Sequence, residues 1–399
     1  MKGPRSFTGE DVVEIHAHGG PLILQSICQA LVKNQSRLAE PGEFTKRAFL
    51  NGRLDLTQAE AVLDTIKATT EKSLKAAQCQ LRGGLKHKVD QLRDQLIKIL
   101  AHLEAGLDFV EEDITFIQAN EIREGLQAVE NDITQLLESY QEGRILRDGI
   151  RVAIIGRPNV GKSSLLNALL DAYRAIVSSI PGTTRDIIDE VLNIKGIPVR
   201  LIDTAGFRDT PDSIEEEGIR RTRDAVDQAD LVLVVLDGSE ILLEADRQII
   251  QEYAGRRLVV LLNKCDLSHQ FSLEKFQDEW KHLDGKESPQ DQQEFKVIRI
   301  SAKHGIGLDL LRDTIGEFFL RKGFEVGHSE LITQLRHKEA LHQAVESIHR
   351  AIQSVDDSLS GEFIALDIRG SLDGLGQITG TISQEDILDK IFKDFCIGK

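Results

Sequence analysis

The clearest chemical signal in this sequence is a glycine-rich loop at residues 156–163, which reads GRPNVGKS. It fits the pattern G-x-x-x-x-G-K-[ST], follows an apolar run at 151–155 and precedes a helical pattern. Glycines let backbone N–H groups approach phosphate closely, while Lys162 would reach the outer phosphates and Ser163 would offer its hydroxyl to Mg²⁺. The loop therefore predicts a site for a nucleoside triphosphate. Its expected contact residues are Asn159, Val160, Gly161, Lys162, Ser163 and Ser164.

Three further short motifs each follow a predicted strand. They are Asp203-Thr204-Ala205-Gly206, Asn263-Lys264-Cys265-Asp266 and Ser301-Ala302-Lys303. Asp203 would hold the Mg²⁺ shell, and Gly206 would face the γ-phosphate. Asp266 can accept two hydrogen bonds from a guanine edge, which adenine cannot match. The last motif would close over the base. Four motifs in this order resemble the small GTPase superfamily, and that resemblance implies GTP rather than ATP.

The usual water-orienting glutamine is absent from this sequence. In Ras-like GTPases it follows Asp-x-x-Gly, and here that position is Phe207. Asn159 together with the stretch SSIPGTTRD at 178–186 resembles potassium-activated GTPases, in which a cation supplies the charge of an arginine finger. The resemblance implies K⁺ ligands at Asn159, Ser178, Ile180 and Thr183, and Mg²⁺ ligands at Ser163 and Thr184. The nucleotide-contacting stretch comprises Ser178, Ser179, Ile180, Pro181, Gly182, Thr183 and Thr184.

These motifs need a parallel sheet to position them. Apolar runs at 151–155, 199–202, 231–236, 258–262 and 296–300 alternate with helical stretches, which is typical of strands buried on both faces. The predicted fold is a doubly wound, mostly parallel P-loop G domain, of mixed α/β class.

Helical patterns flank the predicted sheet on both sides. Leucines and other apolar residues recur at three- and four-residue spacing between Leu85 and Leu107, and again between Leu331 and Ile352. A capping-box pattern predicts a further helix that begins at Thr57. Ahead of it, the sequence predicts a strand at 11–16, a helix from Pro21 to about Val32 and a loop over 37–54. The two flanks form either one bundle that the G domain interrupts or two separate helical units.

Composition narrows the class of protein. The chain has 399 residues, too many for one ordinary core, and its formal charge is −16. An acidic surface repels phosphate backbones, so a contact with nucleic acid needs a local basic patch or a partner protein. The cysteines are far apart and form no CxxC pair, so neither a disulfide framework nor a zinc site is predicted. Without a secretory signal or a membrane-spanning apolar run, the chain is expected to be cytoplasmic, with no membrane partner.

Two outer segments distinguish this chain from other GTPases. The last five residues are Phe395-Cys396-Ile397-Gly398-Lys399, and the first segment contains Thr8-Gly9-Glu10-Asp11, PGEF at 41–44 and RAFLNGRLDL at 47–56. They resemble the C-terminal Cys-x-Gly-Lys signature and the N-terminal domain of the MnmE (TrmE) family. The resemblance covers essentially the whole chain and implies about 65 further residues ahead of Ser6, including a folate-contacting arginine.

The family resemblance implies further site residues. A glutamate that orients the attacking water falls on Glu215. Cys396 matches a cysteine required for a modification reaction, as a thiolate nucleophile or a redox group. Glu14, Arg53 and Lys399 match positions that hold 5-formyltetrahydrofolate or a related folate at a dimer interface.

The resemblance also implies a domain organisation. A truncated N-terminal α/β domain for folate binding and dimerisation covers 1–51, and the G domain covers 149–322. The helical domain consists of 52–148 and 323–399. Homodimers would form through the N-terminal and G domains.

The implied activity is GTP hydrolysis assisted by Mg²⁺ and K⁺. In a heterotetramer with a flavoprotein partner, MnmG (GidA), the protein would add an aminomethyl or carboxymethylaminomethyl group at C5 of the wobble uridine of certain tRNAs. Two other functions stay open. One is a regulatory GTPase switch that binds ribosomes or other RNA, which the Cys396 signature and the lack of a recognisable basic appendage disfavour. The other is a structural fragment, which the intact phosphate loop disfavours.

Overall fold

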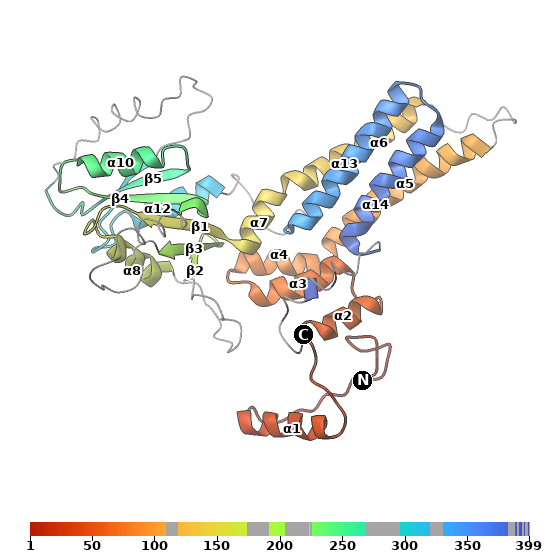
Figure 1. Cartoon of the computed structure of the whole chain (residues 1–399), viewed down its shortest axis with the longest axis horizontal. Helices are drawn as coiled ribbons and strands as arrows, with labels where there is room; N and C mark the ends of the chain where they lie inside the picture. The colour runs from red at the N-terminus through yellow and green to blue at the C-terminus, as the bar shows by residue number, and fades with distance from the viewer. Residues whose placement is uncertain are drawn as a thin grey trace. The chain divides into compact units, whose positions relative to one another are not determined.

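A computed structural model gives the fold of the chain (Figure 1). It describes residues 1–108, 119–173, 191–203, 223, 226–268, 296–319, 330–381, 388, 391–392, 395 and 398. Contacts divide the chain into two compact units. The helical unit comprises 1–68, 74–144 and 326–399, and the sheet unit comprises 69–73 and 145–325.

The sheet unit is built on six strands in the order β2-β3-β1-β4-β5-β6. They are β1 (Ile150–Ile155), β2 (Val191–Ile194), β3 (Ile197–Asp203), β4 (Leu231–Asp237), β5 (Leu258–Asn263) and β6 (Lys296–Arg299). Strand β2 pairs antiparallel with β3, and the other neighbouring strands of the described sheet pair in parallel. Because β1 lies between β3 and β4, the strand order reverses beside it, which is where open α/β sheets bind ligands.

Side chains of the central strands alternate between two cores. Val152 and Ile154 of β1 pack with α8 (Lys162–Tyr173) and α12 (Leu308–Phe319) on one face. Ala153 and Ile155 pack on the other face in a cluster that includes Ile250 of α10 (Glu244–Glu252). Burial on both faces explains why these strands are continuous apolar runs. The predicted doubly wound fold is thereby confirmed, and five of its six strands were predicted.

The strand missed by pattern analysis is β2. It has only four residues, VLNI, and it lies at the edge of the described sheet, where Asn193 is exposed. A short edge strand with a polar residue carries little periodic signal.

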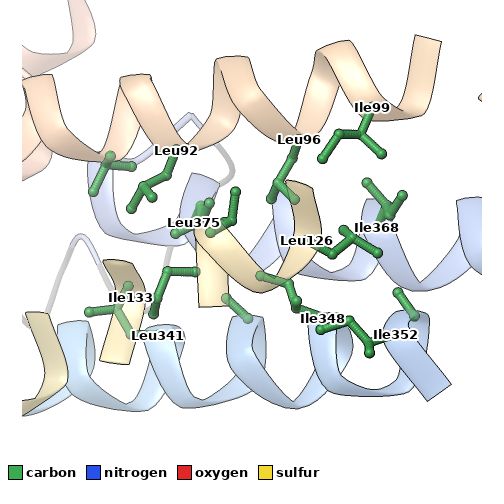
Figure 2. Close-up of a cluster of buried hydrophobic side chains, with 14 of the residues drawn as sticks. Leu92, Leu96, Ile99, Leu126, Ile133, Leu341, Ile348, Ile352, Ile368 and Leu375 are labelled. Atoms are coloured by element: carbon green, nitrogen blue, oxygen red, sulfur yellow. The ribbon is translucent and has the colours of Figure 1, made fainter. Parts of the chain in front are cut away.

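The helical unit has one continuous core made from both flanks of the sheet unit. It lies between α5 (Gly84–Asp108), α6 (Ala119–Glu138), α13 (Leu335–Asp356) and α14 (Gly361–Thr379). Figure 2 shows Leu96 and Leu126 from the first flank beside Ile348 and Ile368 from the second. Of the two arrangements open at the sequence level, the single interrupted bundle is therefore the one formed.

The remaining helices precede or join these elements. They are α1 (Pro21–Lys33), α2 (Glu43–Leu50), α3 (Leu56–Lys67), α4 (Glu71–Leu81) and α7 (Tyr140–Asp148). No helix in the described ranges is both long and apolar enough to cross a membrane.

Three local predictions in this region were wrong. Residues 11–16 form no strand; among the described residues no neighbouring strand pairs with them, and Val13 is 87% exposed. The predicted loop over 37–54 contains the helix α2, which begins at Glu43 after Gly42 in the left-handed conformation. The capping box was predicted at Thr57 but is formed by Asp55 and Gln58. The Asp55 carboxylate accepts from the backbone N–H of Gln58, and the Gln58 side chain accepts from the backbone N–H of Asp55.

Candidate nucleotide site at the carboxyl edge of the sheet

The predicted motifs of the sheet unit converge on one edge of the sheet. Gly156 follows β1, Asp203 ends β3, Asn263 ends β5 and Ser301 lies just beyond β6. Because these strands are parallel, their carboxyl ends open onto the same crevice. The fold therefore brings together the strand ends from which the four motifs begin, although these motifs span almost 150 residues of sequence.

The glycine-rich loop has a backbone that only small or special residues adopt. Gly156 and Gly161 have φ angles of 147° and 100°, and Asn159 has a φ of 65°. A Cβ at Gly156 would collide with the carbonyl of Val235, and one at Gly161 with the side chain of Asn263. The glycines are thus required for close packing of the loop, which also leaves its N–H groups without covering side chains.

Lys162 stabilises the loop from its carboxyl end. Its Nζ donates to the carbonyl oxygens of Gly156 and Arg157, both at 2.8 Å. Helix α8 begins at Lys162, and its first intrahelical bond runs from the N–H of Leu165 to the carbonyl of Gly161 at 2.9 Å. Ser163 and Ser164 are exposed in this first turn, where amide groups without intrahelical acceptors and the helix dipole favour an anion.

Asn263 connects the phosphate loop to the motif after β6. Its side-chain amide donates to the carbonyl of Val160 at 2.8 Å, and its Oδ1 accepts from the backbone N–H of Ala302 at 3.0 Å. The residue is only 3% exposed, so both bonds are made away from water. The asparagine is therefore a structural link between the phosphate and base ends of the site.

Asp266 is held in a fixed position at the base end. Its Oδ1 accepts from the hydroxyl of Ser301 at 2.6 Å, and this hydrogen bond lowers the pKa of the Asp266 carboxyl. Ser301 is fully buried, whereas Asp266 and the neighbouring Lys303 are exposed. A charged carboxylate thus faces solvent at the place where a guanine edge would be recognised.

Two polar contacts beside the motifs were missed at the sequence level. Lys264, with a φ of 64°, forms a short ion pair with Asp237 at the end of β4. Burial raises the pKa of Asp237, but hydrogen bonds from Lys264 and Ser239 outweigh burial and hold it below its usual range. The sequence signal that could have identified Asp237 is the pair Asp237-Gly238, which directly follows the apolar run 231–236.

The second missed contact fixes the outer side of the phosphate loop. Arg157 donates from Nε to the nearly buried Asp246 at 2.6 Å and lies 3.2 Å from Glu240. Arg157 is a variable position of the loop pattern, so no motif identifies its partner, which is 89 residues away.

Several predicted site residues lie outside the described residues. These are Ser178, Ser179, Ile180, Pro181, Gly182, Thr183, Thr184, Thr204, Ala205, Gly206, Glu215, Cys396 and Lys399. Asp203 is described only as the last residue of β3.

Two of the predicted folate residues, Glu14 and Arg53, lie among the described residues of the helical unit. Glu14 and Arg53 are both exposed, and the Glu14 carboxylate lies 3.6 Å from His16. A hollow of about 270 Å³ is lined by residues of the same N-terminal segment, including Glu10, Glu43 and Arg47. Hydrogen bonds from Arg37, from the Glu40 backbone and from Arg47 lower the pKa of Glu43 to about 2. Neither Glu14 nor Arg53 lines this hollow.

Two family models match almost the whole chain. The model described as the MnmE helical domain matches residues 56–396, and the model described as the GTP-binding protein TrmE N-terminus matches residues 1–53.

Relatives resemble the chain over its full length. A protein of Alkaliphilus oremlandii named tRNA modification GTPase MnmE is 46% identical over 399 residues, covering 100% of this chain and 84% of the relative. A protein of the same name from Acetivibrio thermocellus is 44% identical with the same coverage.

Solved structures resemble a part of the chain. An Era variant from *Aquifex aeolicus* bound to GDP and AlF₄⁻ is 28% identical, covers 50% of this chain and 66% of its own, and has a TM-score of 0.32. The G domain of the FeoB iron transporter from *T. maritima* is 24% identical, covers 42% of this chain and 98% of its own, and has a TM-score of 0.30.

Proposed function

The chain belongs to the MnmE family of tRNA modification GTPases, and from this membership we propose that it couples GTP hydrolysis to modification of the wobble uridine of tRNA. The observation that carries the proposal is the convergence of the phosphate loop, Asn263 and Asp266 on one edge of the sheet. GTP hydrolysis and a role in tRNA modification follow from the family. The finer chemistry below is our inference.

GTP fits the crevice at both ends. The loop around Gly161 would hold the β- and γ-phosphates through backbone N–H groups, with Lys162 as their cation. The Asp266 carboxylate would accept from N1 and N2 of guanine. Ser163 and Thr184 would together hold Mg²⁺. When bound, Mg²⁺ would neutralise negative charge on the β- and γ-phosphate oxygens.

Hydrolysis would be attack by water on the γ-phosphorus. The bond from phosphorus to the β–γ bridging oxygen breaks, GDP and inorganic phosphate are released, and the proton of the water passes to the phosphate. We assign the orientation of the water to Glu215. K⁺ would be held by Asn159, Ser178, Ile180 and Thr183, and it supplies positive charge beside the transferred phosphoryl group. The exposed Asn159 at the tip of the loop is available for this role.

The modification step would use the outer parts of the chain. We propose that Cys396 acts in it, that Glu14, Arg53 and Lys399 bind a folate one-carbon donor, and that the flavoprotein MnmG is the partner. Homodimers would form through the domains at 1–51 and 149–322, with the helical domain in the parts 52–148 and 323–399. The product would carry an aminomethyl or carboxymethylaminomethyl group at C5 of the uridine.

The decisive experiment compares GTP hydrolysis in KCl and NaCl at equal ionic strength. We expect a large increase in K⁺ alone, because Na⁺ is too small to bridge the same ligands. Asn159→Gly should abolish the difference, since it removes the amide oxygen without straining a backbone with a φ of 65°. Asn120→Ala, at an exposed position of α6, should keep it.

The same reactions test whether GTP hydrolysis is coupled to modification of the tRNA. With MnmG and substrate tRNA added, nucleoside analysis should find the modified uridine only where GTP is hydrolysed. Equal hydrolysis in both salts would exclude the K⁺ assignment. Hydrolysis without any change in the tRNA would favour a regulatory switch instead.

A further inference from the structure

The chain is acidic overall, but one segment has the opposite charge. Between Glu71 and Asp90 no acidic residue occurs, while the basic residues are Lys72, Lys75, Arg82, Lys86, His87 and Lys88. In a chain with a formal charge of −16, such a segment is a local positive field on a negative molecule. It is also the kind of local basic patch that an acidic protein needs in order to bind a polyanion.

Part of this segment lines a hollow of about 400 Å³ where α4 joins α5. The lining residues are Lys75, Gln78, Cys79, Arg82, Gly83, Gly84 and His87. Four of them recur at i, i+3, i+4 and i+7, the spacing of one helical face. The N–H of Arg82 donates to the carbonyl of Gln78 at 3.0 Å, so Arg82 continues that face just beyond the end of α4.

Two glycines allow the helices to meet at this hollow. Gly83 has a φ of 88°, and a Cβ at Gly84 would lie 3.2 Å from the Cys79 sulfur. The chain therefore turns within two residues, and α5 begins directly at the edge of the hollow. The positive end of its dipole adds to the charge of the side chains.

Four of the basic side chains of the segment divide into two groups. Lys86 is paired with Asp90 and Lys88 with Asp132, each at 2.7 Å, so these two serve the packing of the helices. Lys75 and Arg82 are exposed and form no ion pair with the part of the chain that the structure describes. Stabilisation of the negative end of α4 would explain Arg82 but not Lys75, which lies in the first half of that helix.

We propose that the hollow between α4 and α5 binds phosphate groups of the tRNA backbone, with Lys75 and Arg82 as the cations that hold them. Gln78 and His87 add hydrogen-bond donors for phosphate or ribose oxygens. The inference rests on the proposed function, because tRNA is the polyanion on which that function acts. It explains how an acidic chain contacts RNA through its own surface.

The test measures binding of substrate tRNA to the full chain with MnmG present, over a series of salt concentrations. The variant is Lys75→Gln with Arg82→Gln, and the matched control is Lys33→Gln with Lys98→Gln, which removes the same charge from exposed positions of α1 and α5. Loss of two phosphate contacts should reduce the slope of log K against log salt by about 1.4 to 1.8. The control should keep the wild-type slope, and all three proteins should hydrolyse GTP alone at the same rate.

A second measurement needs no substitution. Cys79 lies in the hollow, so bound tRNA should protect it from maleimide, while the exposed Cys28 of α1 serves as the reference in the same digest. Equal salt slopes for both double variants, or unchanged Cys79 labelling, would overturn the assignment while leaving tRNA as the substrate. A wild-type complex that binds no tRNA would remove the proposed function as well. Binding to anionic vesicles is measured for the same variants. If Lys75→Gln with Arg82→Gln lost vesicle binding but kept tRNA binding, the hollow would be assigned to a lipid surface instead.

Discussion

At the residue scale, the proposed specificity for guanine rests on the placement of Asp266. Its carboxylate is positioned by the Ser301 hydroxyl at 2.6 Å, and Ser301 is itself fully buried. The same bond lowers the pKa of Asp266, so the carboxylate stays charged at pH values below the ordinary range for aspartate. Two acceptors of fixed position match the two donors of guanine, whereas adenine offers no such pair.

Asp266→Asn should reverse the preference of the site. The asparagine keeps one acceptor oxygen for N1–H but places an NH₂ donor opposite the N2 amino group of guanine, so GTP affinity should fall by at least about 100-fold. Xanthosine triphosphate has a carbonyl at C2, which can accept from the new amide, and its affinity should rise. Fluorescent-nucleotide titration with both ligands measures the change. Equal GTP affinity in the two proteins would show that Asp266 does not contact the base.

At the scale of elements, a buried ion cluster joins α3 to α13. The Arg336 guanidinium donates to both Glu60 oxygens at 2.6 and 2.8 Å, and the fully buried His337 lies 3.0 Å from Glu60. Burial raises the pKa of Glu60, but the charges and hydrogen bonds of Arg336 and His337 lower it to about 2. Arg336 also donates to the carbonyl of Ile378, so the cluster reaches the end of α14.

The pKa of Glu60 predicts how stability depends on pH. A carboxyl whose pKa is lower in the folded chain than its ordinary value of about 4.3 stabilises the fold fully above that value. The contribution should then decrease as the pH falls from about 5 to about 2. Denaturant unfolding of the helical unit across this range should show the decrease.

Glu60→Gln leaves Arg336 in the cluster without its carboxylate. Breaking a buried pair in this way should cost about 3–5 kcal/mol at neutral pH and flatten the acid dependence. Glu339→Gln, at an exposed position of α13, is the matched control and should change little. An unchanged acid profile in Glu60→Gln would show that another group causes the dependence.

At the scale of the whole molecule, the helical unit and the sheet unit bury their apolar side chains in separate clusters. The helical core contains Leu341 and the sheet core contains Leu261, both fully buried. No apolar cluster in the described ranges includes residues of both cores. The nucleotide motifs lie entirely in the sheet unit.

Separate cores predict separate responses to core substitutions. Leu341→Ala and Leu261→Ala should each cost about 2–5 kcal/mol, but in different unfolding transitions. GTP at 100 times its Kd should stabilise the sheet unit by about 2.7 kcal/mol and leave the transition lowered by Leu341→Ala unchanged. Calorimetry with and without nucleotide measures this. A single transition that shifts as a whole would show that the units unfold together.

The sequence by itself determined the type of the central elements and the order of the nucleotide motifs. Gly156 and Gly161 are recognisable because the loop is a local structure whose backbone demands glycine, and Lys162 follows them at a constant spacing. The strands are recognisable because burial on both faces makes them continuously apolar. The family resemblance rests on equally local segments at the two ends of the chain.

Tertiary structure decided which distant surfaces meet. The bond from Asn263 to Val160 spans 103 residues, and the one from Arg336 to Glu60 spans 276. An amphipathic stripe shows that a helix has a partner but not which one, so only folding joined the two flanks into one bundle. The same limit hid the hollow beside Lys75, because a helical face becomes a cavity only when a second element closes it. Short-range patterns specify elements, while complementarity in three dimensions selects their partners.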